Sequence, residues 1–319
     1  METMSDVSSA GSAERLAGPV CSMEGLVRRA RSLPARIVVI ASAQDQVALE
    51  AAALAEEEGL ARSVLVGDRV RIETLLRGMD RDPKAFEIVD RQGTEEAVTT
   101  SVKLVREGHG HLLMKGRVTT GGLLREVLHR DRGLRTGSLL SDVFLFDCPL
   151  PGEPRLMGIT DGGINMTPDL ETKARILTNA LEVFRALGFE RPKVAVLSAV
   201  EKVNPDLPST VDAAELARRG GEGLFGDCEV AGPLAMDLAL SAEAARRKGV
   251  ESPVAGAADV LLFPSIEAAN ITAKALQYMV PFEPGHVVVG ARAPVLIPSR
   301  SESARAKVNA VALGRLMVD

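Results

Sequence analysis

The chain of 319 residues contains no Trp, a single Tyr and only 3% aromatic residues. Proteins that bind single-stranded nucleic acid stack the bases on aromatic side chains, so this composition argues against that class of function. The formal net charge of −5 argues equally against duplex nucleic acid or an anionic membrane as a general partner. An anionic metabolite held by a local basic pocket is compatible with the sequence.

Cysteines are also scarce: Cys21, Cys148 and Cys228 lie far apart and form no CxxC pair. This pattern argues against a disulfide framework or a zinc ribbon and favours a reducing compartment. No apolar run approaches the ~20 residues that a membrane-spanning helix needs. The start of the chain is rich in Ser, Gly, Ala and acidic residues and lacks the layout of a signal peptide. We therefore expect residues 1–22 to be a disordered lead-in and the protein to be cytoplasmic.

What the sequence does contain is typical of a globular α/β protein. Hydrophobic residues make up 46% and charged residues 25% of the chain, and its length exceeds one ordinary core. Continuous apolar segments such as Arg36–Ala41, Ser63–Gly67 and His111–Met114 alternate with amphipathic helical segments. This alternation predicts largely parallel sheets that are covered by helices on both faces.

A Pro-rich segment, residues 149–154, interrupts the alternation after a predicted strand over residues 143–146. We place a domain crossing there. The predicted first domain comprises residues 23–148 and, because the last strand and helix are expected to return to it, residues 297–319. The predicted second domain comprises residues 149–296.

Near the end of the chain, Ser299 and Arg300 separate an apolar run from a helix. Residues 287–296 are interpreted as one buried strand, and helical periodicity starts at Ser301. Open α/β sheets bind ligands at such strand-to-helix turns. The first N–H groups of the helix and the guanidinium would both favour an anion. The alternative is a capping serine beside a solvated arginine.

A second turn of this kind follows the predicted fourth strand at residues 115–122. It carries the cations Lys115 and Arg117, the hydroxyls of Thr119 and Thr120, and two glycines, a combination that suits a phosphate or pyrophosphate. It matches neither GxxxxGK[ST] nor GxGxxG, so no nucleotide fingerprint is present. A flexible turn is the alternative.

The segment Gly133–Ser141 precedes a predicted strand and sets Arg135 between Gly and hydroxyl residues, among them Thr136 and Ser138. A guanidinium with neighbouring hydroxyl donors matches the oxygens of a phosphate. This segment is therefore a second candidate anion clamp. An ordinary β-turn explains it equally well.

Two further post-strand turns add polar side chains. Asp161 precedes Gly162 and Gly163, and is interpreted as a base, a metal ligand or an Asx-turn former, the last being the commonest role of Asp before Gly. Asn270 belongs to the turn after the strand near residue 260. His109 and His111 have no nearby Cys, Asp or Glu to complete a metal site, so surface histidines are the simpler interpretation and no metal is expected.

Taken together and in this order, these turns resemble the phosphate acetyl/butyryltransferase family. The similarity spans about residues 25–317, and no one motif carries it. The sequence of Gly133–Ser141 and the overall chain length resemble those of the butyryltransferase branch. The matching stretches are the Lys115-Gly116 turn, residues 133–141, 159–165, 194–205, 209–213, 232–237 and 252–259, and Pro298-Ser299-Arg300.

The resemblance implies a two-domain α/β fold like that of isocitrate and isopropylmalate dehydrogenases, with the active site in the interdomain cleft. It implies a homodimer or a larger homo-oligomer. The implied reaction converts a short acyl-CoA, butyryl or acetyl, and phosphate into acyl phosphate and CoA by direct transfer. Coenzyme A and phosphate are then substrates, and no permanently bound cofactor is expected. The alternatives are a catalytically silent acyl-CoA- or phosphate-binding protein and a metal- and NAD-dependent hydroxyacid dehydrogenase on the same fold.

By this resemblance, Ser299 and Arg300 match the serine–arginine pair at the family's reaction centre, and Arg135 matches an arginine that holds phosphate. Residues expected to bind phosphate or CoA are Arg135, Thr136, Ser138, Lys115, Thr119 and Asn270.

One position departs from the family. The acetyltransferase branch carries an aspartate six positions after the arginine, proposed to deprotonate the CoA thiol, and this chain has Ala306 there. Glu302, on the same turn, or Asp161, from across the cleft, is the expected substitute. The sequence does not predict the length of the acyl chain, because small changes in the lining of a pocket decide whether one or two more methylene groups fit.

Overall fold

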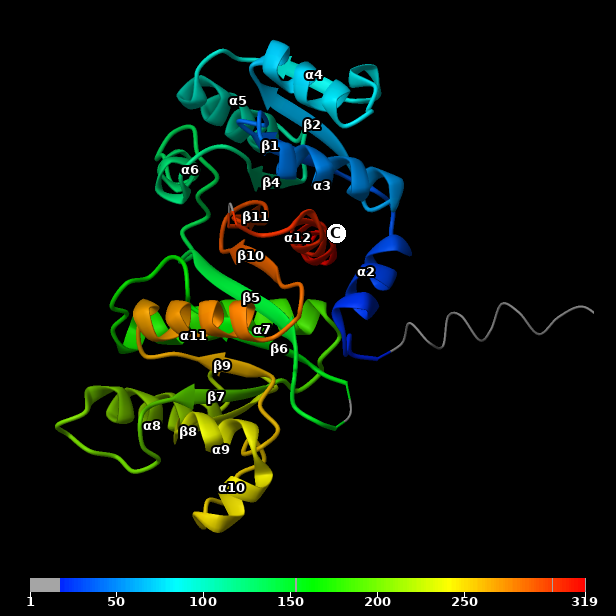
Figure 1. Cartoon of the computed structure of the whole chain (residues 1–319). Coiled ribbons are helices and arrows are strands. Elements are labelled where there is room, and N and C mark those ends of the chain that lie inside the picture. The colour runs from blue at the N-terminus through cyan, green and yellow to red at the C-terminus, as the bar shows by residue number, and fades with distance from the viewer. Residues whose placement is uncertain (1–17, 153, 300, 319) are drawn as a thin grey trace, which may run out of the picture.

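The computed structural model describes residues 18–152, 154–299 and 301–318. The predicted lead-in lies largely outside these residues and stays a prediction. Within them, eleven strands form one sheet in the order β3-β2-β1-β4-β11-β10-β5-β6-β9-β7-β8, with helices on both faces (Figure 1). The prediction of a mixed α/β fold is confirmed. The two predicted sheets are continuous with each other.

The first half of the sheet is parallel throughout. Four of its strands are largely buried: β2 (Ala61–Gly67), β1 (Arg36–Ala41), β4 (Leu112–Lys115) and β11 (Val295–Leu296). The edge strand β3 (Glu87–Asp90) buries only Ile88. Successive side chains of a strand point to opposite faces, so Val38 and Ile40 of β1 join one core cluster and Val39 and Ala41 join another. The first cluster packs against α2 (Met23–Arg31), α3 (Gln46–Glu57), α4 (Arg69–Gly78) and α12 (Ala304–Leu316); the second against α5 (Thr94–Arg106) and α6 (Thr120–Val127).

The second half of the sheet is mixed. β5 (Ser141–Asp147) runs antiparallel to both β10 (Gly285–Val289) and β6 (Leu156–Thr160), and the strands beyond β6 are parallel to it: β9 (Val260–Leu262), β7 (Lys193–Leu197) and β8 (Glu229–Leu234). One face packs against α7 (Leu170–Ala186) and α8 (Pro208–Gly221). The other packs against α9 (Met236–Leu240), α10 (Ala242–Arg247) and α11 (Ile266–Met279). α9 and α10 are separate short helices, because Ser241 ends α9 and caps α10.

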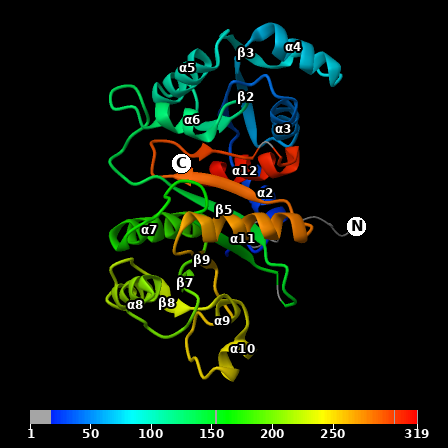
Figure 2. The ribbon, with the colours of Figure 1, turned by 60° about the vertical axis from the view of Figure 1, so that its left-hand side comes forward.

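The prediction of one strand over residues 287–296 is also wrong. The chain turns at Gly290, whose φ of +95° favours glycine, and a Cβ there would lie 1.9 Å from the carbonyl oxygen of Leu139. β10 and β11 therefore form an antiparallel hairpin through Val288 and Val295. Because β10 pairs with β5 and β11 pairs with β4, this hairpin joins the two halves of the sheet (Figure 2).

The helix predicted from Ser301 begins three residues later. Ser303 caps α12 by accepting a hydrogen bond from the main-chain N–H of Ala306 at 3.0 Å. Residues 299, 301 and 302 thus lie between β11 and α12, outside both elements. The domain boundaries stay a prediction, and β5 of the predicted first domain pairs with β6 of the predicted second. No helix within the described residues is long and apolar enough to cross a membrane.

Candidate active site

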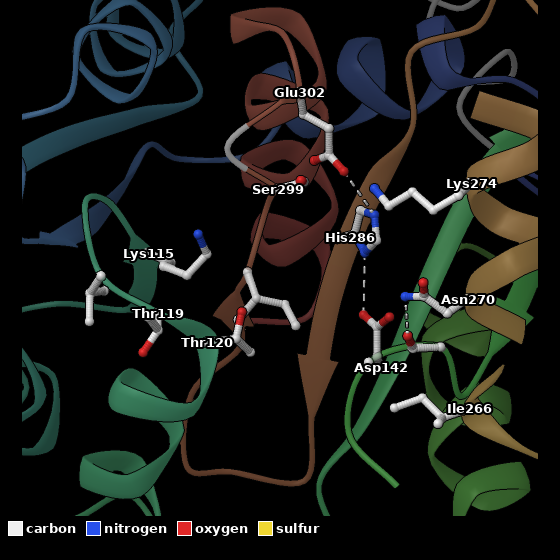
Figure 3. A pocket seen from close by; sticks show the side chains of 14 residues that line it. Lys115, Thr119, Thr120, Asp142, Ile266, Asn270, Lys274, His286, Ser299 and Glu302 are labelled. Carbon is white, nitrogen blue, oxygen red and sulfur yellow. Dashed lines mark hydrogen bonds and ion pairs between the residues drawn. The ribbon is translucent and has the colours of Figure 1, made fainter. Parts of the chain in front are cut away.

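A cavity of about 380 Å³ lies where the central hairpin meets the two halves of the sheet (Figure 3). The turn after β4 supplies one wall, and β5 and α11 supply the opposite wall. β10 and the turn before α12 lie between them. The carboxyl ends of β4 and β11 meet here because the two strands are parallel neighbours. Strand topology alone therefore brings together turns that lie more than 180 residues apart.

Five residues predicted from the sequence line this cavity: Lys115, Thr119, Asn270, Ser299 and Glu302. Lys115 ends β4 and is buried, and Thr119 caps α6 by accepting from the N–H of Gly122 at 3.1 Å. The amide of Asn270 donates to the carbonyl of Gly162 at 2.8 Å, which links α11 to the turn after β6. The predicted meeting of polar turns is thus present in the geometry.

The second predicted anion clamp lies elsewhere in the described part of the chain. Arg135, Thr136 and Ser138 are exposed and do not line the cavity. Arg135 forms an isolated bridge with Ala291, and the hydroxyl of Thr136 donates to the carbonyl of Gly290 at 2.6 Å. In this structure the loop is fastened to the turn between β10 and β11. Arg300 lies outside the described residues.

Asp161 is buried next to the cavity but does not line it within the described structure. One of its carboxylate oxygens accepts from the N–H groups of Gly163 (2.9 Å) and Ile164 (3.0 Å). The other accepts from the main-chain N–H and the amide of Asn165, at 3.1 and 2.5 Å. Burial and the charge of Asp142 raise the pKa of Asp161 to about 6, against the effect of these donors. Its role is that of an Asx-type turn former.

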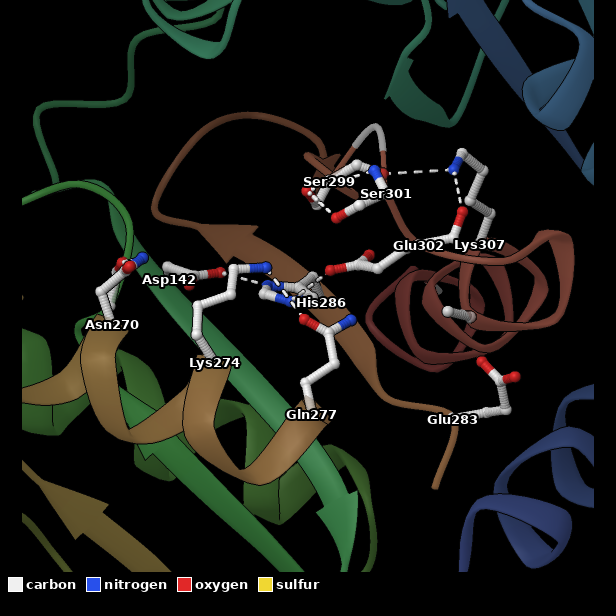
Figure 4. Close-up of polar contacts among 12 residues, drawn as sticks. Asp142, Asn270, Lys274, Gln277, Glu283, His286, Ser299, Ser301, Glu302 and Lys307 are labelled. Atoms are coloured by element: carbon white, nitrogen blue, oxygen red, sulfur yellow. Dashed lines mark hydrogen bonds and ion pairs between the residues drawn. The ribbon is translucent and has the colours of Figure 1, made fainter. Parts of the chain in front are cut away.

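Lys307 of α12 lies beside the turn that precedes the helix and holds it in place (Figure 4). Its buried ammonium donates to the main-chain carbonyls of Ser299 (3.3 Å) and Glu302 (3.0 Å). Burial lowers the pKa of Lys307. The hydroxyl of Ser299 lies 3.0 Å from that of Ser301, and the N–H of Glu302 donates to the carbonyl of Ser299 at 3.2 Å. This turn therefore sets the positions of the Ser299 and Glu302 side chains in the cavity.

Three charged or titratable lining residues were missed by sequence reasoning: Asp142 at the start of β5, His286 near the start of β10, and Lys274 of α11. The imidazole lies between two carboxylates, with Nδ1 3.4 Å from Oδ1 of Asp142 and Nε2 3.3 Å from Oε1 of Glu302. Burial lowers the pKa of His286, but the two carboxylates outweigh burial and raise it to about 10. A single His opening an apolar run was the available signal.

Glu302, like Asp142, is a deeply buried acid of the cavity. Only 4% of the residue is exposed, and neither carboxylate oxygen has a hydrogen-bond partner among the described residues. Burial by itself raises the pKa of Glu302, but His286 and Lys274 together lower it by more, so the net shift is downward. The cavity wall therefore contains a carboxylate whose pKa is lowered and whose oxygens accept no hydrogen bond within the described residues. No group of three or more His, Cys, Asp or Glu side chains in the described chain is arranged to hold a metal ion.

Comparisons with known proteins agree with this geometry. The profile of the Phosphate acetyl/butaryl transferase family matches residues 21–99 and 91–314. The phosphate butyryltransferase of Clostridium beijerinckii is 42% identical over 296 residues, covering 93% of this chain and 97% of that protein. The phosphate acetyltransferase of Rhizobium meliloti is 39% identical over 291 residues, covering 91% and 92%.

Solved structures give the same result at the level of the fold. The branched-chain phosphotransacylase from Enterococcus faecalis superposes with a TM-score of 0.77 at 28% identity, covering 89% of this chain and all of that chain. A 4-hydroxythreonine-4-phosphate dehydrogenase from Burkholderia phymatum superposes with a TM-score of 0.52 at 12% identity, covering 89% and 98%. The second likeness concerns the fold alone and agrees with the expected dehydrogenase-like architecture.

Proposed function

The chain belongs to the phosphate acetyl/butaryl transferase family and is a phosphate acyltransferase, and we propose that it exchanges CoA and phosphate on a short acyl group by direct transfer. Phosphate attacks the thioester carbon of acyl-CoA, the C–S bond breaks, and acyl phosphate and CoA leave. The observation that carries this proposal is one cavity in which the cation Lys115, the hydroxyl of Ser299 and the ionised Glu302 meet. Direct transfer is supported by the described lining, which contains no cysteine.

The anion is assigned to the cationic side of the cavity. We assign the phosphoryl group to Lys115 and Arg300, the latter by its match to the family's serine–arginine pair. The hydroxyl of Ser299 donates to the oxygen that becomes negative as the acyl carbon is attacked. Loss of such a donor costs about 10²–10³ in rate. Thr119 and Asn270, on opposite walls, position the remaining polar groups of the substrates.

Glu302 is assigned as the general base that removes the thiol proton when the reaction consumes CoA. Ala306, which replaces the family's aspartate, is buried on the first turn of α12 and supplies no proton acceptor. Glu302 lines the cavity with both oxygens unpartnered within the described residues. Asp161 is not assigned this role, because four N–H donors already occupy its carboxylate. General-base catalysis contributes about 10²–10⁴ in rate.

A neighbouring cavity of about 470 Å³ between α5 and α6 suits the phosphates of CoA. It shares Val118 and Thr119 with the first cavity, so one molecule reaches both along the turn after β4. Arg117 and Arg125 line it and provide guanidinium groups for phosphate oxygens. We assign the acyl group to the apolar side chains of Val118 and Ile297 in the first cavity, and propose butyryl or acetyl as the group carried.

We further propose that the enzyme acts as a homodimer in the cytoplasm. α11 exposes Ile271, Tyr278 and Met279 by 67, 75 and 82%, and Asn270 and Lys274 of the same helix line the cavity. Apolar side chains gathered on one helix support an interface between copies. The three cysteines are unpaired, which supports a reducing compartment.

The deciding experiment measures thiol release from acetyl-, propionyl-, butyryl- and longer acyl-CoAs with and without phosphate. Phosphate-dependent release of CoA, with acyl phosphate as the product, supports the transferase. Tight binding of acyl-CoA without turnover would instead identify a silent binding protein. Reduction of NAD by a hydroxyacid would identify a dehydrogenase, and either result would overturn the proposal.

A further inference from the structure

The cavity contains a charged group that the transfer chemistry described above does not use. His286 lies between Asp142 and Glu302, and all three line the cavity (Figure 4). They come from three different elements, β10, β5 and the turn before α12. Two carboxylates this deeply buried would each carry a large desolvation cost without a cation between them.

Resting on the proposed function, we propose that Asp142, His286 and Glu302 act as one unit in which His286 is a positioning residue. The imidazolium holds Glu302 ionised and in place as the base for the CoA thiol, and Asp142 holds the imidazolium charged. When Glu302 takes the thiol proton, the charge of the unit changes from −1 to 0. The thiolate then attacks the acyl carbon of acyl phosphate. The bond between that carbon and the bridging oxygen breaks, and phosphate leaves.

The geometry separates this unit from an ordinary buried ion pair. An ion pair whose role is purely structural is satisfied by short hydrogen bonds, whereas His286 lies 3.3 Å from Glu302 in an orientation that forms none. Both oxygens of Glu302 and Nε2 of His286 have no hydrogen-bond partner in the described structure. Glu302 therefore keeps acceptor capacity for a proton that arrives from the cavity.

Other charged groups face this unit and affect its titration. Lys274 on α11 lowers the pKa of Glu302 from across the cavity, and Lys307 on α12 donates to the carbonyl of Glu302. Asp161 lies close enough to Asp142 for their charges to interact. The ring of Phe144 packs edge-on against His286 with centroids 4.6 Å apart, which excludes water from that side.

The test is the pH profile of kcat/KM for CoA with acyl phosphate as the second substrate, in the wild type and in His286→Gln. Loss of the imidazolium leaves burial as the dominant influence on Glu302, so the pKa of Glu302 rises. The base is then protonated at higher pH, and the acidic limb moves upward by at least about one pH unit. At pH values below the limb, kcat/KM of His286→Gln therefore falls by about tenfold or more beyond any loss that it shows at high pH.

Asp142→Asn is the second variant, and it keeps the test valid should His286→Gln not fold. It removes one of the two carboxylates that stabilise the imidazolium charge, and Glu302 remains as the other. The limb therefore moves in the same direction by a smaller amount. His109→Gln, on the exposed α5–β4 loop, is the matched control and leaves the limb in place. An equal loss at every pH, or a limb that does not move, overturns the proposal while the wild-type exchange stands. A wild type without exchange overturns the proposed function instead.

Discussion

Lys307→Met separates the stability of the fold from the geometry of the cavity. The ammonium of Lys307 is buried and donates to the carbonyls of Ser299 and Glu302, one on each side of the turn. Methionine has a similar length and no donor. The substitution therefore removes both attachments of the turn and leaves the packing around the side chain nearly unchanged.

The expected change in stability is small because two effects oppose each other. Loss of two hydrogen bonds from a charged donor costs about 3–6 kcal/mol together. Removal of the buried ammonium also removes its desolvation penalty, which offsets this loss by several kcal/mol. We expect the free energy of unfolding to change by less than about 2 kcal/mol. Activity should fall by about 10²-fold, since a displacement of reacting groups by about 1 Å has that effect.

The matched control is Lys173→Met. Lys173 is equally buried, but its ammonium pairs with Asp212 at 2.6 Å between α7 and α8, and it does not line the described cavity. This change leaves a partly buried carboxylate unpaired and should cost about 2–4 kcal/mol while kcat stays within about twofold. Urea unfolding and thiol-release kinetics on both variants measure the two quantities. The reasoning is refuted if Lys307→Met keeps wild-type kcat, or if both variants lose activity only in proportion to stability.

Four further changes test other parts of the account. Arg300→Ala should abolish most phosphate-dependent thiol release with the melting temperature unchanged; wild-type turnover would remove Arg300 from the site. Glu302→Gln should lower CoA consumption by about 10²–10⁴ in stopped-flow assays while acyl-CoA binding persists; an unaffected rate would exclude Glu302 as the base. Gly290→Ala should cost about 2–4 kcal/mol in urea unfolding, because its φ is positive and its Cβ would meet a carbonyl oxygen; a cost below about 1 kcal/mol would contradict this. Tyr278→Glu should shift the light-scattering mass from dimer to monomer; an unchanged mass, or a wild-type monomer, would place the interface elsewhere or nowhere.

The sequence predicted the sheet well where strands are continuous buried runs. β1 has the predicted bounds because both of its ends are marked by changes in hydrophobicity. It failed at the central hairpin, where Gly290 turns the chain within one apolar run, and periodicity does not distinguish a turn from a buried strand. It also failed at the start of α12, since Ser301 and Ser303 are equally good caps by sequence and only the fold selects Ser303.

The same distinction applies to the site. Lys115 and Ser299 were found because each follows a strand, and neighbouring parallel strands bring such turns together. Asp142 and His286 were missed because each is a single polar residue at the start of a strand. What identifies them is their diagonal position across the antiparallel β5–β10 ladder, in which His286 pairs with Phe144 and Asp142 pairs with Val288. This is a property of register, not of local sequence.

The position of the acid explains why the cavity contains a histidine. In this chain the helix starts at Ala304, so Ala306 points into the packed first turn of α12 and Glu302 lies before the helix. Glu302 on the turn is buried, and burial alone would raise its pKa. A cation from a neighbouring strand is then required to keep it ionised, and His286 is 3.3 Å away. On the proposed assignment, the base of this cavity therefore lies on the turn and not at the helix position that the acetyltransferase branch uses, and His286 is the cation beside it.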